Sequence, residues 1–357
     1  MKILDRYIAV TLLQTTAIAL IVLLSLFTFL SLIDQLEETG RGNYDVITAI
    51  KYVLLILPRI AYELIPIAAV MGSMTTLGIL AHNSELVIIR ATGMSLFRLG
   101  YAFVKGGVVI IIFAVVIGEF IAPYCEQTAQ HMRSVALTQQ IALKTKNGFW
   151  SRDGSSFINI RKILPGDQVE DIYIYEFDKE DRLRISTYAK RAEYLNNQWL
   201  LEDIEQSIIE KEKITKKYLK FAAWESLLNP EVLNLLTMKP QYLTLLELYN
   251  YINYLRQNGQ NSKLYEQALW SKIINPLTII AMVMLGVPLV NAHARTDSVS
   301  QRVFMGCFIG IAFHIFNQVS GQMGVVYSIN PAASAIIPTV LILTGTFWMM
   351  RKNIRLE

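Results

Sequence analysis

The sequence predicts an α-helical membrane protein with six transmembrane helices, three on each side of an inserted antiparallel β domain. Hydrophobic residues make up 53% of the 357 positions and charged residues only 17%, against about 25% charged residues in soluble domains. Residues 126–272 hold 39 of the 62 charged side chains. This composition disfavours a soluble enzyme and a disordered chain. The net charge of +4 is too small and too scattered to indicate nucleic-acid binding.

Three apolar segments precede the polar region and define a first membrane part, residues 1–122. A helix needs about 20 apolar residues to cross the hydrocarbon. The uncharged run 7–33 has that length and exceeds the hydrophobic region of a cleavable signal peptide. The second segment covers about 48–80, and the third covers about 100–122.

The second membrane part is predicted at residues 271–357. Its first span is the uncharged run 273–294. Residues 303–350 follow without one Asp, Glu, Lys or Arg, which is too long for a single span. Asn330 and Pro331 supply a turn in the middle of this run, so it divides into two spans.

Basic residues predict the orientation. The ends of the chain and the loops after the second and fourth spans carry most of those near the membrane: Lys2, Arg6, Arg90, Arg98, Arg295, Arg302, Arg351, Lys352 and Arg355. By the positive-inside rule these loops and both termini are cytoplasmic. Residues 123–270 are then expected on the opposite side of the membrane.

This polar insert is predicted to be mainly antiparallel β structure. Short alternating runs recur between turn signals, including Asp153-Gly154 and Asn196-Asn197. Five or six such strands are typical of a sandwich or a jelly roll. Residues 241–270 have the apolar spacing of a connecting helix. Two roles stay open, a solvated stabilising domain and a domain that handles an amphiphile.

A short amphipathic helix is predicted within residues 81–97, on the cytoplasmic side between the second and third spans. Leu86 and Ile89 fall near one helical face, while Glu85 and Arg90 offer charges. The pattern fits a helix that presents these groups to a partner. It fits equally a membrane-surface helix without a partner.

Few polar groups interrupt the spans. Arg59 and Glu63 lie four residues apart, so they either pair or meet an anionic headgroup in a wet cavity. His314 lies within the fifth span, where it either faces the substrate or packs between helices. Gly306 and Gly310 allow close helix packing in the same span. The motifs of phosphate-loop ATPases, zinc proteases and serine hydrolases are absent from the sequence.

Several motifs together resemble the LptF/LptG family, the lipopolysaccharide-export permeases of Gram-negative bacteria, with a closer match to its LptG members. They are LDRYI at the start, LIDQLEETGRGNYD after the first span, SELVIIRATG in the cytoplasmic loop, GEFIAP at 118–123 and LWSKIINPL at 269–277. The resemblance runs along the whole chain.

The resemblance implies a multi-pass inner-membrane protein whose insert is a periplasmic β-jelly roll. It also implies partners, namely an LptF-like sister permease, a homodimeric cytoplasmic LptB-like ABC ATPase and a single-span LptC-like protein. Lipopolysaccharide would be extracted from the outer leaflet and passed to an LptA-like periplasmic bridge. The chain itself is then expected to be no enzyme and to carry no cofactor, with ATP and Mg on the partner ATPase.

The resemblance also implies functional residues. Glu85 matches the acidic residue of the coupling helix that contacts the ATPase, with Leu86, Ile89 and Arg90 beside it. The first and fifth spans form a lateral gate in the family. Position along these and neighbouring segments suggests the lipid contacts Arg59, Arg133, Phe27, Phe313, His314 and Phe316.

One departure concerns Glu37 and Glu38, where the family has lysines. Two carboxylates would repel phosphorylated sugars, so either Arg41, Arg59 and Arg133 replace that positive charge or the substrate carries less negative charge near that face. Three alternatives remain, namely a mechanotransmitting ABC permease, a secondary lipid transporter and a membrane scaffold. A secondary transporter would usually carry ionisable residues in both halves, and the second half has no carboxylate in residues 275–294 or 303–350.

Overall fold

Among the residues that the structure describes, six helical segments are long and apolar enough to cross a membrane. A computed structural model describes residues 2–138, 143–153, 156–164, 168–178, 180, 182–195, 198–209, 213–224, 239–291, 299–327 and 329–355. Three of the six segments precede a β-sheet and three follow it. The predicted arrangement of three spans, an insert and three spans is therefore confirmed.

The first half forms three long helical segments and one short helix. Asp45 caps the second long segment, since its side chain accepts a hydrogen bond from the Thr48 N–H at 2.8 Å. The third long segment continues well past residue 122, where the sequence predicted the span to end. The elements are α1 (Lys2–Leu36), α2 (Val46–His82), α3 (Glu85–Ala91), α4 (Leu96–Val116), the π-helical turn η1 (Ile117–Ile121) and α5 (Ala122–Thr138).

The second half returns through a connecting helix, as predicted, but this helix is shorter than the predicted range 241–270, because it ends at Gln257 and the next helix begins at Lys263. Asn330 and Pro331 separate the last two spans as expected, and the Asn330 side chain accepts from the Ala332 N–H at 2.9 Å. The elements are the 3₁₀ turn η2 (Pro240–Tyr242), α7 (Leu245–Gln257), α8 (Lys263–Asn291), α9 (Val299–Val326) and α10 (Pro331–Arg355).

The insert is a six-stranded antiparallel sheet whose strands pair in chain order. The strands are β1 (Leu143–Asp153), β2 (Ser156–Leu164), β3 (Gln168–Phe177), β4 (Leu183–Leu195), β5 (Gln198–Ile209) and β6 (Ile214–Trp224). The antiparallel direction and the inserted position match the expected jelly roll, while the described strands form one up-and-down sheet. The pairs Asp153–Ser156 and Leu195–Gln198 flank the predicted turns, whose residues 154 and 196–197 lie outside the described ones.

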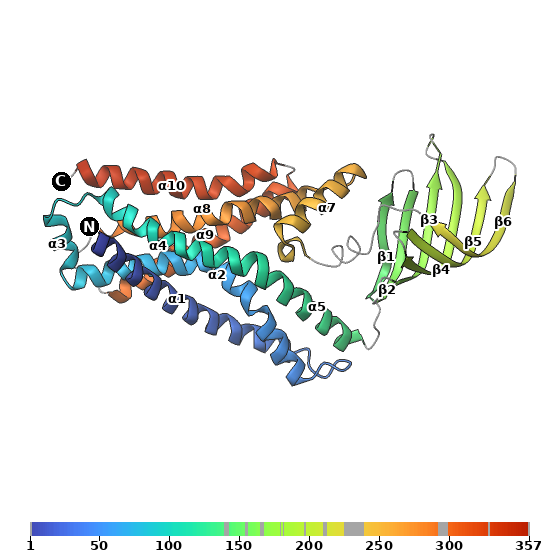
Figure 1. Cartoon of the computed structure of the whole chain (residues 1–357), viewed down its shortest axis with the longest axis horizontal. Helices are drawn as coiled ribbons and strands as arrows, with labels where there is room; N and C mark the ends of the chain where they lie inside the picture. The colour runs from blue at the N-terminus through green and yellow to red at the C-terminus, as the bar shows by residue number, and fades with distance from the viewer. Residues whose placement is uncertain are drawn as a thin grey trace.

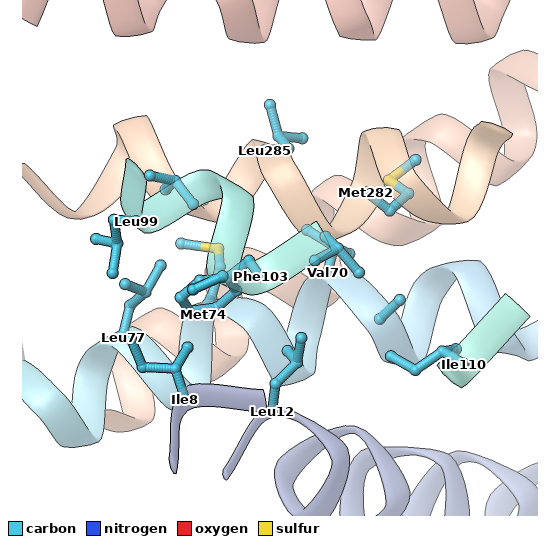
Figure 2. Close-up of a cluster of buried hydrophobic side chains, with 14 of the residues drawn as sticks. Ile8, Leu12, Val70, Met74, Leu77, Leu99, Phe103, Ile110, Met282 and Leu285 are labelled. Atoms are coloured by element: carbon cyan, nitrogen blue, oxygen red, sulfur yellow. The ribbon is translucent and has the colours of Figure 1, made fainter. Parts of the chain in front are cut away.

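The membrane bundle is held by α2, which packs against α1 on one side and α9 on another. Figure 2 shows Ile8 and Leu12 of α1 reaching toward Val70, Met74 and Leu77 of α2 in the largest hydrophobic cluster. Small residues permit this approach. A Cβ added at Gly306 would lie 3.0 Å from the Met71 Cα, and one at Gly310 would lie 2.7 Å from Ile67 Cγ2. The predicted close packing of the fifth span is therefore confirmed.

The sheet has its own core and meets the bundle through α7 (Figure 1). Alternate residues of the central strands, such as Ile158, Ile172 and Ile204, are buried in one cluster. Tyr251 and Leu255 of α7 belong to the same cluster. At the opposite end of the molecule lie α3 and both chain termini (Figure 1).

Candidate functional site

A cavity of about 520 Å³ lies between α2, η1, α5, the first half of α8 and the second half of α9. The turn η2, which leads into α7, contributes Tyr242 to its wall. Three of the residues suggested as lipid contacts line it, namely Arg59, Phe313 and His314. This cavity is the candidate site in the membrane part of the chain.

Arg59 is held by two carboxylates. Its Nη1 atom lies 2.8 Å from Glu63 Oε1, and its Nε atom lies 3.1 Å from Glu126 Oε2 on α5. The guanidinium also stacks over the Tyr242 ring, 5.5 Å from its centroid. Glu126 is only 1% exposed, so Arg59 neutralises a carboxylate that would otherwise be buried without a counter-charge. The predicted ion pair between Arg59 and Glu63 is therefore present, and Arg59 forms a second ion pair with Glu126.

Arg133 lies outside the lining of the cavity and is also paired. Its guanidinium makes a two-pronged contact with Glu38, with Nη2 at 2.7 Å and 2.6 Å from the two carboxylate oxygens. Its guanidinium also lies over the Tyr52 ring. One of the two acidic residues that depart from the family pattern therefore has a partner on α5. This pairing removes the free positive charge that the sequence suggested for Arg133.

The wall between η1 and α8 contains a third ion pair. Lys272 Nζ lies 2.9 Å from Glu119 Oε1 and donates to the Gly118 carbonyl at 3.2 Å. The backbone positions four and five residues on offer this carbonyl no donor, because the Ala122 N–H bonds to Ile117 and Pro123 carries no N–H. Lys272 supplies the missing donor.

Glu119 also reaches α7. Its second carboxylate oxygen accepts a hydrogen bond from the Leu245 N–H at 2.9 Å, in the first turn of that helix. The motifs GEFIAP and LWSKIINPL, which are far apart in sequence, therefore meet in one junction. Through α7, this junction connects the cavity wall to the sheet.

The cavity-facing side of α9 is polar. His314, Asn317, Gln318 and Gln322 all line the cavity, at the spacing of one helical face. None of these four side chains makes a hydrogen bond to the part of the chain that the structure describes. In a membrane-spanning helix such groups need a hydrophilic occupant, because hydrocarbon offers them no partner.

Two suggested lipid contacts lie elsewhere. Phe27 of α1 and Phe316 of α9 are both exposed on the outside of the bundle, and neither lines the cavity. Phe316 points away because the opposite face of α9 carries the amides. The six suggested lipid contacts therefore divide between the cavity, the outer faces of two helices and the Arg133–Glu38 pair.

The predicted surface helix is present as α3. Leu86 and Ile89 are only 5% and 7% exposed, and Leu86 belongs to the main hydrophobic cluster. These two residues anchor α3 to its own chain, so the expectation that they contact a partner is corrected. Val87 and Ile88, at 61% and 63% exposed, form the outward apolar face instead.

The two charged residues of α3 are Glu85 and Arg90. Glu85 is half-buried and accepts a hydrogen bond from the Asn83 side chain at 3.2 Å. The side chain of Arg90 lies outside the described residues. Glu85 also hydrogen-bonds with the Tyr7 hydroxyl of α1, so it is held at the edge of the exposed apolar face of α3.

Sequence reasoning missed the junction residues Glu119 and Lys272 and the amides of α9. Both junction residues lie in motifs that the sequence made conspicuous, but their pairing joins helices 153 positions apart. The signal for the amides was the spacing of Asn317, Gln318 and Gln322 around His314. Among the described residues, no group of three or more His, Cys, Asp or Glu gathers as a metal site would require.

Comparison with known proteins places these features in a family. The sequence profile of the lipopolysaccharide export system permease LptF/LptG matches residues 6–352. The lipopolysaccharide export system permease protein LptG of Haemophilus influenzae is 32% identical over 352 residues, which cover 98% of either chain. The protein of the same name from Escherichia coli K12 is 31% identical and covers 98% of this chain and 99% of its own. The chain therefore belongs to the LptF/LptG family of lipopolysaccharide export system permeases.

Proposed function

We propose that this chain is a non-catalytic permease subunit of an ABC-type lipopolysaccharide exporter. It extracts lipopolysaccharide from the outer leaflet of the bacterial inner membrane and delivers it toward a periplasmic bridge. The observation that carries the proposal is the family match over residues 6–352, because it covers both membrane halves, α3 and the sheet together.

The sheet and α3 are suited to different steps of export, the sheet to receiving lipid and α3 to contacting an ATPase. The sheet lies at one end, and α3 lies at the other beside both chain termini (Figure 1). The basic residues near the membrane favour a cytoplasmic location for the α3 end. The sheet is then periplasmic, where it can receive lipid, and α3 faces the cytoplasm, where ATP is available.

In this proposal α3 is the contact with a separate ATPase. Val87 and Ile88 offer an apolar face that no described residue covers, and Glu85 adds a carboxylate beside it. A homodimeric LptB-like ATPase would bind ATP and Mg and would close against this face. Rigid-body movement of the packed helices would then transmit the closure to the bundle.

The outer faces of α1 and α9 are assigned to the remaining partners. Both helices pack on α2 and leave large apolar side chains exposed, among them Phe27 and Phe316. An LptF-like sister permease meeting these faces would enclose a path for the acyl chains. A single-span LptC-like protein and an LptA-like bridge complete the assembly that the family name implies.

Purification in a mild detergent, followed by mass spectrometry of copurifying proteins, tests the proposal. A soluble ATPase and a second six-span permease are expected with the wild-type chain. Ile88→Asp should remove the ATPase from the complex, because a carboxylate in an apolar contact costs its desolvation, and Glu85→Ala should weaken the same contact.

The matched control is Ile214→Asp, which changes an equally exposed isoleucine at the sheet end. It should leave the ATPase bound. Recovery of a stable chain without an ATPase would favour a secondary lipid transporter. Recovery of an ATPase without a second six-span permease or bound lipopolysaccharide would favour a mechanotransmitting permease.

A further inference from the structure

The two faces of α9 differ in chemistry. The exposed side chains on the outer face, such as Phe308, Phe316 and Val319, are apolar. The cavity face carries three amides and one imidazole, and this face also lacks hydrogen-bond partners in the described part of the chain. Each amide offers donors and an acceptor, and a neutral imidazole offers one of each. Such a face matches an occupant that both donates and accepts hydrogen bonds.

The wall on α8, which packs beside α9, adds hydroxyl and amide groups. Gln267, Ser271 and Asn275 recur on α8 at intervals of four residues, and all three line the cavity. The rings of Tyr62 and Tyr242 lie in the same lining. Aromatic faces and amides together suit a ring that is apolar on its faces and hydroxylated at its edge.

The charges of the cavity argue against an anionic occupant. The two basic side chains of the lining, Arg59 and Lys272, are both paired, the first with Glu63 and Glu126 and the second with Glu119. These ion pairs therefore contain two cationic side chains and three carboxylates. A phosphate would meet net negative charge and would have to break an existing ion pair to gain a partner.

We propose that this cavity binds the uncharged, hydroxyl-rich sugar part of an amphiphile, through the amides of α9, and that it is not a phosphate site. The proposal rests on the proposed function, since a glycolipid exporter presents such a headgroup. It assigns to the interior of one chain a sugar subsite separate from the outer faces of α1 and α9.

A cysteine-protection experiment on the full-length chain in lipid nanodiscs tests the proposal. Cys125 and Cys307 are replaced by serine, and Val325, which lines the cavity, is replaced by cysteine as a reporter. The rate at which a small thiol reagent alkylates the reporter is measured with octyl β-glucoside or with octyl phosphate. The glucoside is expected to slow the reaction, and the phosphate is expected to leave its rate unchanged.

Two controls separate a sugar site from detergent partitioning. A reporter at Val319→Cys, on the outer face of α9, should react at the same rate with and without the glucoside. Gln318→Leu in the Val325→Cys background should raise the glucoside concentration for half-protection by roughly three- to tenfold, the effect of one or two lost hydrogen bonds. Gln318 is exposed, so this change leaves the packing intact.

Three results would overturn the proposal. They are stronger protection by the phosphate than by the glucoside, no protection by either, and protection that Gln318→Leu leaves unchanged. Because the probe is a simple glucoside, each of these results leaves the export function itself untouched. Failure of the export function would be seen instead as loss of the ATPase and the sister permease on purification.

Discussion

The helices α2 and α9 are both apolar enough to cross a membrane, yet the chain uses them in opposite ways. Of the most apolar 18 residues in α2, 56% are buried, whereas only 17% are buried in α9 and in α1. Helix α2 packs against α1, α8, α9 and α5. Helices α1 and α9 each give one face to α2 and leave another uncovered.

The difference separates the helices that hold the bundle together from those that meet lipid or another protein. In α2, small residues and hydroxyls allow backbones to approach, as where Thr15 hydrogen-bonds to the Gly72 carbonyl and to Thr76. In α1 and α9 the uncovered side chains are large and apolar. Hydropathy finds both kinds of helix, and only burial tells them apart.

The largest effect is expected from Gly72→Leu, at the contact between α1 and α2. A Cβ at Gly72 would lie 2.7 Å from the backbone of Thr16, so the helices must separate, at a cost of about 3 kcal/mol or more. Size-exclusion chromatography after a heat step should show loss of the folded peak. Gly345→Ala is the control, because a Cβ there meets nothing within 4 Å, and its peak should match wild type.

The next effect is expected from Lys272→Met, which leaves Glu119 without its cation and the Gly118 carbonyl without a donor. Removing one partner of a largely buried pair should cost about 3 kcal/mol and lower the melting temperature. The double variant with Glu119→Gln should recover part of the loss, because no unpaired charge remains. A double variant no more stable than Lys272→Met would show that the two residues do not act as a pair.

A smaller effect on stability, but a clear one on assembly, is expected from Phe308→Ser on the outer face of α9. Phe308 is exposed in the single chain. The free energy of unfolding of the isolated protein should therefore change by no more than about 0.5 kcal/mol. Recovery of the sister permease on purification should fall. The matched change Ile337→Ser on α10 should leave recovery unchanged, and an equal fall in both variants would contradict the special role of α9.

The smallest effect is expected in the sheet, where ion pairs are solvated. The hydrogen bond from Arg191, followed by that from Lys162, lowers the pKa of Glu170 below its ordinary value. A lowered carboxyl pKa stabilises the folded state above the unfolded-state pKa, and this stabilisation is lost as the pH falls through the folded-state pKa. Glu170→Gln should therefore reduce stability at neutral pH by about 0.5 kcal/mol and flatten its acid dependence. Circular dichroism melts between neutral and acidic pH measure this, and a steeper acid dependence in the variant would contradict the pairing.

The spans were predictable because each depends on a local property, an uncharged apolar run of sufficient length. The alternation of the strands and the turn at Asn330 and Pro331 are local signals of the same kind. The continuation of the third span to Thr138 was not predictable in this way. It depends on a π turn whose free carbonyl is satisfied by Lys272, from another helix.

The site was predicted only in part, for the same reason. Arg59, Phe313 and His314 could be placed near a cavity because polar or aromatic residues stand out in an apolar span. Which face of α3 turns outward could not be read from ELVIIRA, since apolar residues occupy most of its circumference. The pairing of Arg133 with Glu38 depends on the packing of α5 beside the loop after α1, which sequence spacing does not reveal.

In the proposed mechanism, this chain moves lipopolysaccharide with energy from an ATPase bound at α3. The most direct test is transfer of labelled lipopolysaccharide from proteoliposomes, containing the purified complex, to a soluble periplasmic acceptor. Transfer is expected to require ATP, and Ile88→Asp is expected to abolish it while the liposomes retain the permease. Equal transfer without ATP, or transfer driven by an ion gradient alone, would contradict it.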